Sequence, residues 1–361
     1  MPDSVPAVKR VVRPGGSNEM RAMILEAIGP LAEGSQPLQL RELPDPSPAD
    51  GELLIDVKTC GVCHTELDEI EGRTPPPRLP IVLGHQVVGR VAALGAGAST
   101  FQVGDRVGVA WIFWACGRCR FCSLGEENLC EQFRATGRDA HGGYAQRMTV
   151  SQAFAHRIPD AFPDAEAAPL LCAGAIGYRS LNLTGLRDGE NLGLTGFGGS
   201  AHLVLKMARH RYPRSRVFVF ARAREEQEFA RELGATWAGD THDEAPERLH
   251  SIIDTTPAWT PIVQALGNLE SGGRLVINAI RKEDGDRSAL LHLDYPAHLW
   301  REKEIKSVAN VTRADVRDFL RLAAEIPLRP EVQEYALEDA NQALVELKLK
   351  HVRGAKVLRI G

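Results

Sequence analysis

The stretch NLGLTGFGGSAHLVLKMARHR, residues 191–211, decides the fold class of this 361-residue chain. It opens with a short apolar run, passes through a glycine-rich turn and continues with apolar residues at helical spacing. The alternation continues through residues 173–310, where RVFVFA precedes EEQEFARELG, SIIDTT precedes TPIVQALGNL, and GRLVINAI closes the series. Strands and helices alternating in this way predict βαβ units, so we expect a doubly wound parallel sheet.

The turn itself, GFGGSA at residues 196–201, has the form G-x-G-x-x-A between a predicted strand and a predicted helix. Gly196, Gly198 and Gly199 let the backbone turn and approach a pyrophosphate, and Ala201 permits close packing of the helix on the sheet. The N-terminus of the helix then faces the phosphate charge. The turn therefore predicts a Rossmann-type dinucleotide site, and the alternative is a plain glycine-rich turn.

The choice of dinucleotide depends on the end of the second strand of this region, in VFVFARAREE. Ala221 stands where a carboxylate would hold the ribose hydroxyls of NAD, and Arg222 and Arg224 follow. Two cations and no repelling acid favour the 2′-phosphate of NADP. The alternative is that the arginines lie on an exposed helix start while Glu225 or Glu226 takes the ribose.

Residues 20–172 have a different character, with short β-rich runs such as ELLIDVKTCGV and QVVGRVAALG separated by frequent glycine and proline. This pattern predicts a compact, loop-rich β domain. Residues 1–19 form an N-terminal extension without visible chemistry, and residues 311–361 contain two amphipathic helices and a last strand, AKVLRI. We expect the last segment to return to the β domain.

The composition is that of an ordinary globular protein, with 43% hydrophobic and 25% charged residues and a net charge of -4. No long run of like charge points to nucleic acid or to an anionic membrane. No apolar run reaches membrane-spanning length, and the N-terminus lacks the apolar core of a secretory signal. We therefore expect a cytoplasmic protein acting on small molecules. In that compartment seven cysteines indicate metal ligands before disulfides.

Four of the cysteines crowd into CGRCRFCSLGEENLC, with the spacing C-x2-C-x2-C-x7-C. They are Cys116, Cys119, Cys122 and Cys130. Four thiolates complete a tetrahedral zinc shell with no open position, which predicts a structural zinc site. The alternatives are an iron–sulfur cluster and four unrelated free cysteines.

The other candidate ligands are scattered. CGVCHTEL at residues 60–67 contains Cys63, LGHQVVG contains His85, and LLCAGAIGY contains Cys172. Taken alone, Cys172 is typical of a small buried hydrophobic residue, and His85 of a hydrogen-bonded structural histidine.

Together, these motifs with the four-cysteine stretch and GLTGFGGSAHL resemble the zinc-dependent medium-chain alcohol dehydrogenases in order and spacing, over about residues 20–361. The resemblance implies a β-rich GroES-like catalytic domain beside the Rossmann domain. It makes Cys63, His85 and Cys172 the ligands of a second, catalytic zinc, a Lewis acid for alcohol or aldehyde oxygen. It also makes Thr65 the first proton carrier and places His64 near the cofactor pyrophosphate.

The sequence departs from the family at four positions that bear on the chemistry. Asp68 replaces a histidine that ends a proton relay in many relatives, and Glu66 replaces the aspartate that orients the zinc histidine. Gln86 replaces a glutamate and so removes a negative charge near the metal. Ala355 replaces an arginine that contacts the pyrophosphate in some relatives.

The expected reaction is reversible hydride transfer between NAD(P) and a primary or small secondary alcohol, with its aldehyde or ketone as the other partner. Trp111 and Thr74 match positions that line the substrate pocket in relatives, although Trp111 is equally typical of a core residue. One alternative is an NADP-dependent cinnamyl-type or polyol reductase. The other is a catalytically silent zinc- and nucleotide-binding protein. The resemblance also implies a homodimer or homotetramer.

Overall fold

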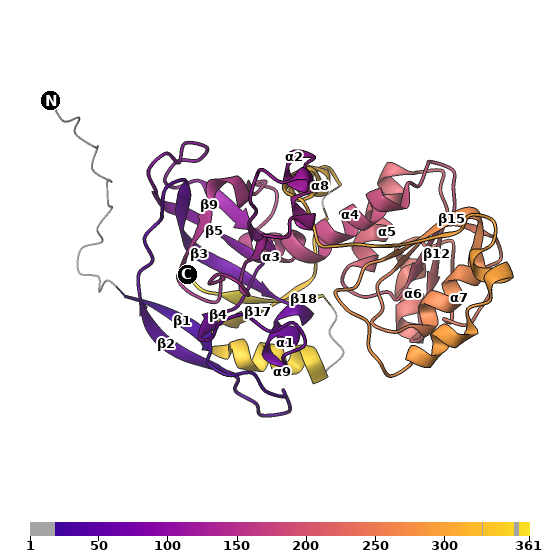
Figure 1. Cartoon of the computed structure of the whole chain (residues 1–361), viewed down its shortest axis with the longest axis horizontal. Coiled ribbons are helices and arrows are strands. Elements are labelled where there is room, and N and C mark those ends of the chain that lie inside the picture. The colour runs from indigo at the N-terminus through magenta and orange to yellow at the C-terminus, as the bar shows by residue number, and fades with distance from the viewer. Residues whose placement is uncertain (1–18, 327, 350–353) are drawn as a thin grey trace. The chain divides into compact units, whose positions relative to one another are not determined.

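The computed structural model describes residues 19–326, 328–349 and 354–361, so nearly all of the expected N-terminal extension lies outside the described residues. The chain divides into two compact units. The first comprises Met1–Cys172, Thr312–Ala324 and Arg329–Gly361, and the second comprises Ala173–Val311 and Glu325–Leu328. Figure 1 shows the order of the elements along the chain.

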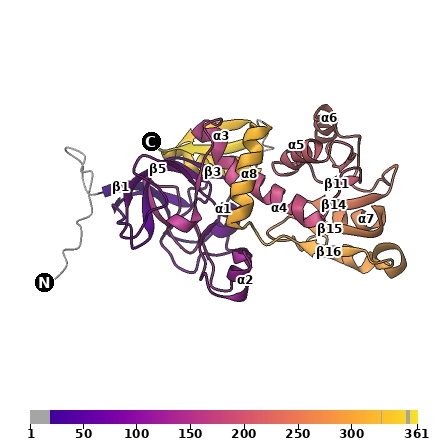
Figure 2. The ribbon, with the colours of Figure 1, turned by 90° about the horizontal axis from the view of Figure 1, so that it is seen from above.

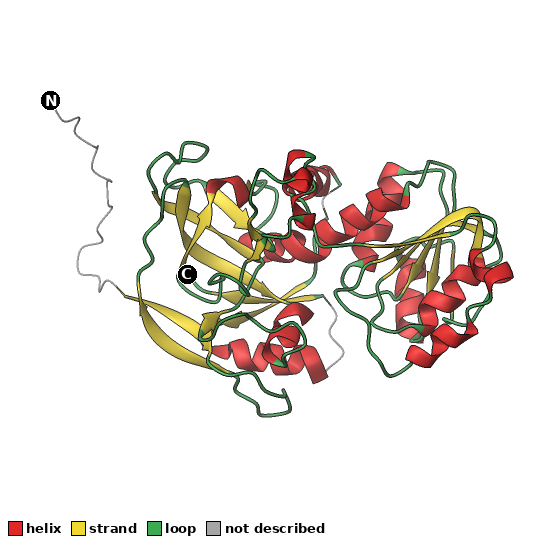
Figure 3. Cartoon of the chain, viewed as in Figure 1, coloured by secondary structure: helices red, strands yellow, loops and turns green. Residues whose placement is uncertain are grey.

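The first unit is rich in strands (Figure 3), and within its described residues these strands form three sheets. In the largest sheet the order is β10 (Ala155–Arg157), β6 (Arg106–Val109), β5 (Val87–Leu94), β3 (Glu52–Val62), β18 (Ala355–Arg359) and β17 (Val332–Ala336), and β9 (Arg147–Ser151) also pairs with β3. The smaller sheets are β2 (Leu38–Pro44), β1 (Glu19–Leu25) and β4 (Ile81–Val82), and the pair β7 (Ile112–Trp114) and β8 (Arg134–Ala135). Its helices are α1 (His64–Ile70), α2 (Arg120–Ser123), α3 (Asp164–Pro169), α8 (Arg313–Glu325) and α9 (Ala340–Leu349).

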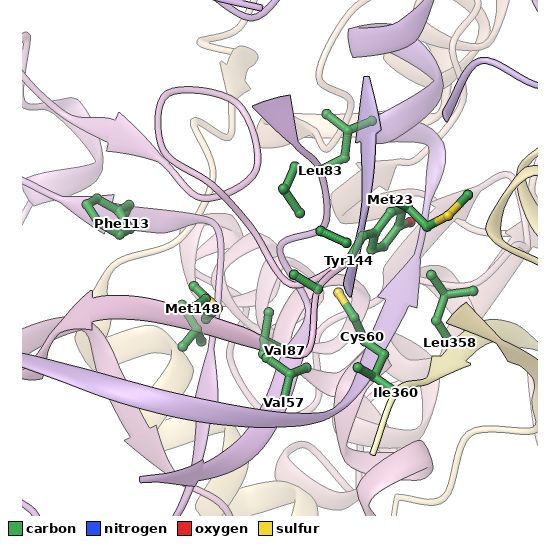
Figure 4. Packing of buried hydrophobic residues seen from close by; sticks show 14 of the residues in the cluster. Met23, Val57, Cys60, Leu83, Val87, Phe113, Tyr144, Met148, Leu358 and Ile360 are labelled. Carbon is green, nitrogen blue, oxygen red and sulfur yellow. The ribbon is translucent and has the colours of Figure 1, made fainter. Parts of the chain in front are cut away.

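Strand β3 runs through the middle of the large sheet and leads directly to the candidate metal ligand Cys63. Its side chains alternate between buried and half-buried positions over most of its length, as expected for a strand with one face on the core. Near its end Cys60 lies opposite Val87 of β5 and Leu358 of β18. Figure 4 shows these three side chains in the apolar core of the unit.

The second unit contains a six-stranded sheet in which every strand pair is parallel. The strand order is β13 (Trp237–Gly239), β12 (Val217–Phe220), β11 (Leu192–Thr195), β14 (Leu249–Asp254), β15 (Leu269–Ile277) and β16 (Glu304–Ser307). The helices of this unit are α4 (Ala175–Thr184), α5 (Ala201–Arg211), α6 (Arg224–Glu232) and α7 (Thr260–Asn268), visible in Figure 2.

The chain starts this sheet at β11 and moves first to one side and then to the other, so the strand order reverses between β11 and β14. That arrangement confirms the doubly wound Rossmann fold expected from the strand and helix pattern. Strands β11 and β12 are buried along their whole length, which explains why both read as unbroken apolar runs. Among the described residues, none of the helices has both the length and the apolar character required to cross a bilayer.

Candidate metal and cofactor sites

Three side chains that are far apart in the sequence converge in the first unit. They are Cys63, which immediately precedes α1, His85 between β4 and β5, and Cys172 in a π-helical turn over Leu170–Gly174. The Nε2 atom of His85 is 3.7 Å from Sγ of Cys63 and 3.4 Å from Sγ of Cys172. His85 is buried, whereas both cysteines are only half-buried. The three donors therefore form one cluster that is partly open on the sulfur side.

The backbone at the start of α1 fixes Cys63. Its Sγ accepts a hydrogen bond from the backbone N–H of Thr65 at 3.3 Å. In return, Oε2 of Glu66 accepts one from the backbone N–H of Cys63 at 2.9 Å. These reciprocal bonds form a capping box in which cysteine occupies the N-cap position, normally taken by serine or threonine. The first turn of the helix thus sets the position of the thiol.

Glu66 also faces the histidine. Its second oxygen, Oε1, lies 2.6 Å from Nδ1 of His85, and both side chains are buried. The two atoms are close but not aligned as a hydrogen bond, so the contact is mainly one of charge. Trp111 packs edge-on against the imidazole, with ring centroids 5.1 Å apart. With Nδ1 turned to the carboxylate, Nε2 is the nitrogen left to face the two sulfurs.

The protonation of the cluster tests whether it fits a metal ion. The adjacent Cys172, and then burial, raise the pKa of the Cys63 thiol well above its usual range. Burial lowers the pKa of His85, but Glu66 and Cys63 outweigh it and hold that pKa well above 6.5. Two crowded thiols cannot both ionise unless a cation lies between them. Two sulfurs and one imidazole nitrogen within 4.8 Å of one another match a zinc shell of three protein donors and one open position.

The four cysteines of the second cluster lie in the loop around α2, also in the first unit, with their sulfur atoms within 4.8 Å of one another. Gly117 and Gly125 make the turns of this loop at positive φ, where a side chain would be strained. Backbone N–H groups of Arg118 and Cys119 directed at Cys116 lower the pKa of its thiol to about 6, which favours the thiolate that a metal requires. Four sulfurs leave no open coordination position, so this cluster fits a structural zinc ion.

A buried carboxylate holds this loop to the start of α8. Oε1 of Glu127 accepts hydrogen bonds from the backbone N–H of Arg313 at 2.8 Å and from its Nε at 2.9 Å. The guanidinium also lies 5.0 Å from the ring centroid of Phe154. Glu127 could not be identified from the sequence, because its partner is 186 residues away and no local spacing connects them.

The remaining predicted residues near Cys63 occupy different environments. Asp68 is buried, and its Oδ1 lies 2.5 Å from Nε of Arg73. Gln86 is buried, Thr65 and Thr74 are half-buried, and His64 is exposed. Asp68, at the position where many relatives have the relay histidine, is thus paired with the Arg73 guanidinium.

Glu69 was not identified from the sequence, yet its carboxylate is buried beside these residues. Among the described residues, neither of its oxygens has a hydrogen-bond partner. Burial, and then the charge of Glu66, raise its pKa well above 4.5.

In the second unit the glycine-rich turn joins β11 to α5. Gly196 has a φ of 75°, and a Cβ there would lie 2.9 Å from Oγ1 of Thr255. At Gly198 and Gly199 a Cβ would meet nothing within 4 Å, so this side of the turn is open. Ala201 begins α5 and is fully buried, as close packing of helix on sheet requires. An open, glycine-lined backbone at the start of a helix fits a dinucleotide pyrophosphate.

The residues expected to choose between the two dinucleotides follow β12. Ala221 is buried, and its carbonyl accepts a hydrogen bond from the side chain of Gln227 at 2.7 Å. Arg222 is exposed. Arg224 is exposed at the first position of α6, and Glu225 follows it on the same turn, also exposed. Both cations and Glu225 are therefore accessible to a ligand, whereas Glu226, the other acid considered, is half-buried.

Known proteins share this architecture. The profile of the alcohol dehydrogenase GroES-like domain matches residues 49–160. The chain is 42% identical, over 97% of its length and 100% of the relative, to a protein of Mycobacterium tuberculosis (strain CDC 1551 / Oshkosh) named "Probable alcohol dehydrogenase AdhA". It is 30% identical, over 94% of its length and 100% of the relative, to an alcohol dehydrogenase of Geobacillus stearothermophilus.

Among solved structures, a cinnamyl alcohol dehydrogenase of Sorghum bicolor superposes with a TM-score of 0.81 at 28% identity, over 94% of this chain and 97% of that one. The likeness spans both units rather than the zinc-binding part alone. With two cysteine-rich clusters and a Rossmann unit, this chain belongs to the zinc-dependent medium-chain alcohol dehydrogenase family.

Proposed function

We propose that the chain is a two-zinc alcohol dehydrogenase that transfers hydride reversibly between a primary or small secondary alcohol and NAD(P), with a preference for NADP. One observation carries this proposal: Cys63, His85 and Cys172 meet with their donor atoms within 4.8 Å, while Glu66 holds the far side of the imidazole. A closed structural site would need a fourth protein donor. Three donors leave room for a substrate oxygen.

Each group has a distinct part in this reaction. When bound, zinc supplies a Lewis acid at the substrate oxygen, and the nicotinamide supplies a hydride acceptor or donor. Alcohol oxidation also releases the hydroxyl proton. We assign the hydroxyl of Thr65, two residues after Cys63, as its first carrier, which would receive this proton while passing its own on toward solvent. Glu66 keeps the His85 ring in one orientation. Gln86 is buried next to His85 in the chain and adds no charge there.

The four-cysteine cluster would hold the second zinc ion as a structural centre. This assignment is supported by its four sulfur donors and by the absence of any further donor position in a tetrahedral shell. Its role is to stabilise the loop that Glu127 fixes to Arg313.

The preference for NADP is supported by the missing carboxylate at the end of β12. Ala221 offers no carboxylate for the ribose hydroxyls, and Arg222 and Arg224 are exposed beside it. A guanidinium binds phosphate with charge-assisted hydrogen bonds, whereas a carboxylate would repel it. Gly196, Gly198 and Gly199 would take the pyrophosphate. The exposed His64 is assigned to the same cofactor on the family resemblance alone.

We propose that Trp111 and Thr74 line the substrate pocket. Trp111 is 8% exposed and packs on His85, so it belongs to the apolar core and also borders the candidate metal. The Oγ1 atom of Thr74 is buried without a hydrogen-bond partner among the described residues. An apolar wall with one hydroxyl favours uncharged alcohols and carbonyl compounds. The second candidate, a cinnamyl-type reductase, is favoured by the fold likeness to the sorghum enzyme.

We also propose that the protein is a homodimer or homotetramer. All four residues of the edge strand β16 are exposed, and Trp300, shortly before it, is 56% exposed. An open strand edge can pair with the same strand of a second copy. Light scattering after size-exclusion chromatography tests this, and a monomer at micromolar concentration would contradict it.

The function is tested by metal analysis together with initial rates at 340 nm. The panel pairs NAD and NADP with ethanol, benzyl alcohol, cinnamyl alcohol and sorbitol, and the reduced cofactors with the matching carbonyl compounds. We expect turnover of the first two alcohols, fastest with NADP. Turnover of cinnamyl compounds alone, or of polyols alone, would show that the substrate class differs from the one proposed. Two zinc ions without turnover of any pair would refute the assigned activity.

A further inference from the structure

A buried ion pair lies at the point of the second unit where the strand order reverses. Thr195, Asp254 and Ile277 occupy equivalent positions at the carboxyl ends of the parallel strands β11, β14 and β15. The glycine-rich turn begins at the next residue, Gly196. Ligands of doubly wound sheets bind outside these strand ends, at the reversal of the strand order. A charged residue buried here is therefore placed where it can act on a ligand loop.

Asp254 is fully buried, and its carboxylate contacts side chains from three different segments of the second unit. Its Oδ1 accepts hydrogen bonds from Oγ1 of Thr195 at 2.5 Å and from Oγ1 of Thr256 at 2.8 Å. Its Oδ2 pairs with the ammonium group of Lys282. The carboxylate thus joins the last residue of β11 to the loop that follows β14.

Lys282 completes the arrangement from the loop after β15. Besides the ion pair, its Nζ donates to the carbonyl of Thr256 at 2.7 Å and to the carbonyl of Ala258 at 3.1 Å. An ammonium group has three N–H donors, so these contacts use all of them. The side chain is 7% exposed. Lys282 is therefore committed to protein groups, and direct binding of a phosphate is not its role.

The loop that Lys282 holds, residues 255–258, lies directly against the glycine-rich turn. Oγ1 of Thr255 donates to the carbonyl of Thr195 at 3.0 Å, and the backbone N–H of Thr255 donates to the same carbonyl at 2.9 Å. A Cβ at Gly196 would lie 2.9 Å from Oγ1 of Thr255 and 3.0 Å from Cγ2 of Thr256. The loop is therefore hydrogen-bonded to the residue that precedes the turn, and it leaves no room for a side chain at Gly196.

We infer that Lys282 and Asp254 are positioning residues of the dinucleotide site, because they lock the 255–258 loop against Gly196 and so fix the backbone that receives the pyrophosphate. The inference rests on the proposed cofactor role of the turn. Preorganised backbone groups bind more tightly than mobile ones, because ordering them during binding costs free energy. Breaking the Lys282–Asp254 ion pair should weaken the binding of either dinucleotide. It should leave the zinc sites unaffected, since all of the zinc ligands belong to the first unit.

The test measures dissociation constants of NADH and NADPH by fluorescence titration of the zinc-loaded enzyme. Lys282→Met is expected to weaken the binding of both cofactors about tenfold, equivalent to about 1.4 kcal/mol. Lys303→Met is the matched control, because the Lys303 ammonium also caps two carbonyls of this unit, those of Leu266 and Ala297, each at 2.8 Å. The control should change either constant by less than about twofold.

Thr256→Val gives a second, milder test that keeps the ion pair and removes the hydroxyl bond to Asp254. It should weaken cofactor binding about threefold, and it decides the inference if Lys282→Met does not fold. Wild-type affinity in folded Lys282→Met, or in Thr256→Val, would overturn the positioning role. A wild-type protein that binds neither NADH nor NADPH would instead overturn the proposed function. An equal loss in Lys303→Met would reduce the effect to general stability and also overturn the inference.

Discussion

The Oε1 atom of Glu66 lies 2.6 Å from Nδ1 of His85, while the other oxygen of the same carboxylate accepts the backbone N–H of Cys63. One buried side chain thereby fixes two of the three candidate zinc ligands. The family usually has aspartate at this position, one methylene shorter. In this chain the longer acid both caps α1 and reaches the imidazole.

Glu66→Ala should therefore disturb the catalytic centre without removing a ligand. We expect a 10- to 100-fold loss of zinc affinity at that site and a similar loss of kcat/KM, because partners behind a ligating histidine have effects of this size. Competition with a chromogenic chelator measures the affinity. Glu71→Ala is the control, because Glu71 directly follows α1 and pairs with Lys348 and Arg73 instead. Unchanged zinc affinity in Glu66→Ala would show that the carboxylate does not orient His85.

Asp68 should contribute little to proton transfer. Its carboxylate is held by the guanidinium of Arg73, which is also paired with Glu71. We expect Asp68→Asn to change kcat by less than about threefold and to leave the pH–rate profile in place. A profile that loses one limb in this variant would restore Asp68 as the proton exit.

The cofactor preference should depend on Arg222. Replacing it with alanine is expected to lower kcat/KM for NADP about 10- to 100-fold and to leave the value for NAD within about twofold, because one charge-assisted contact to the 2′-phosphate is lost. Arg214→Ala is the control, since that exposed arginine pairs with Asp188 in the same unit. Equal losses with both cofactors would argue against a 2′-phosphate site.

The buried His156 predicts how stability depends on pH. Burial, and then the charge of Arg313, lower its pKa to about 4, and Glu127 opposes the shift only in part. His156 binds a proton at about pH 6.5 in the unfolded chain but only at about pH 4 in the folded chain. Stability from this group is complete above pH 6.5 and is lost as the pH falls through that window, by about 3 kcal/mol in all.

Urea unfolding of wild type and His156→Gln between pH 7 and pH 4 measures this contribution of His156 to the free energy of unfolding. The difference between the two free energies of unfolding should shrink by about 3 kcal/mol on acidification, because the variant lacks the titrating group. Acid releases zinc from the nearby four-cysteine loop in both proteins alike. Comparing wild type with the variant at the same pH therefore removes this contribution from the difference in the free energy of unfolding. A difference that stays constant across the range would contradict the shifted pKa.

The sequence predicted the elements whose pattern is local. Strand β3, the turn from Gly196 to Ala201 and both C-terminal helices carry their signals within about a dozen residues. Helix α1 was not indicated, because it has seven residues and starts at a cysteine cap. Strand β16 was not indicated either, because its four exposed residues show no alternation.

Contacts between distant parts of the chain were the least predictable features. Glu127 with Arg313 and Lys282 with Asp254 join residues from different elements, and the fold alone brings them together. The four-cysteine cluster was predicted from its own spacing. The grouping of Cys63, His85 and Cys172 was implied only by the resemblance to the alcohol dehydrogenase family, because no local spacing connects them. The unpartnered Glu69 had neither signal, and its burial could not be inferred from composition or spacing.

The central claim is that Cys63, His85 and Cys172 hold a catalytic metal separate from the four-cysteine site. Its most direct test is the zinc content and turnover of Cys172→Ala, with Cys60→Ala as the control, since Cys60 is a buried cysteine outside both clusters. We expect Cys172→Ala to keep one of two zinc ions and to lose at least roughly a thousandfold in kcat, while the control keeps both. Two retained zinc ions with wild-type turnover in Cys172→Ala would contradict the claim.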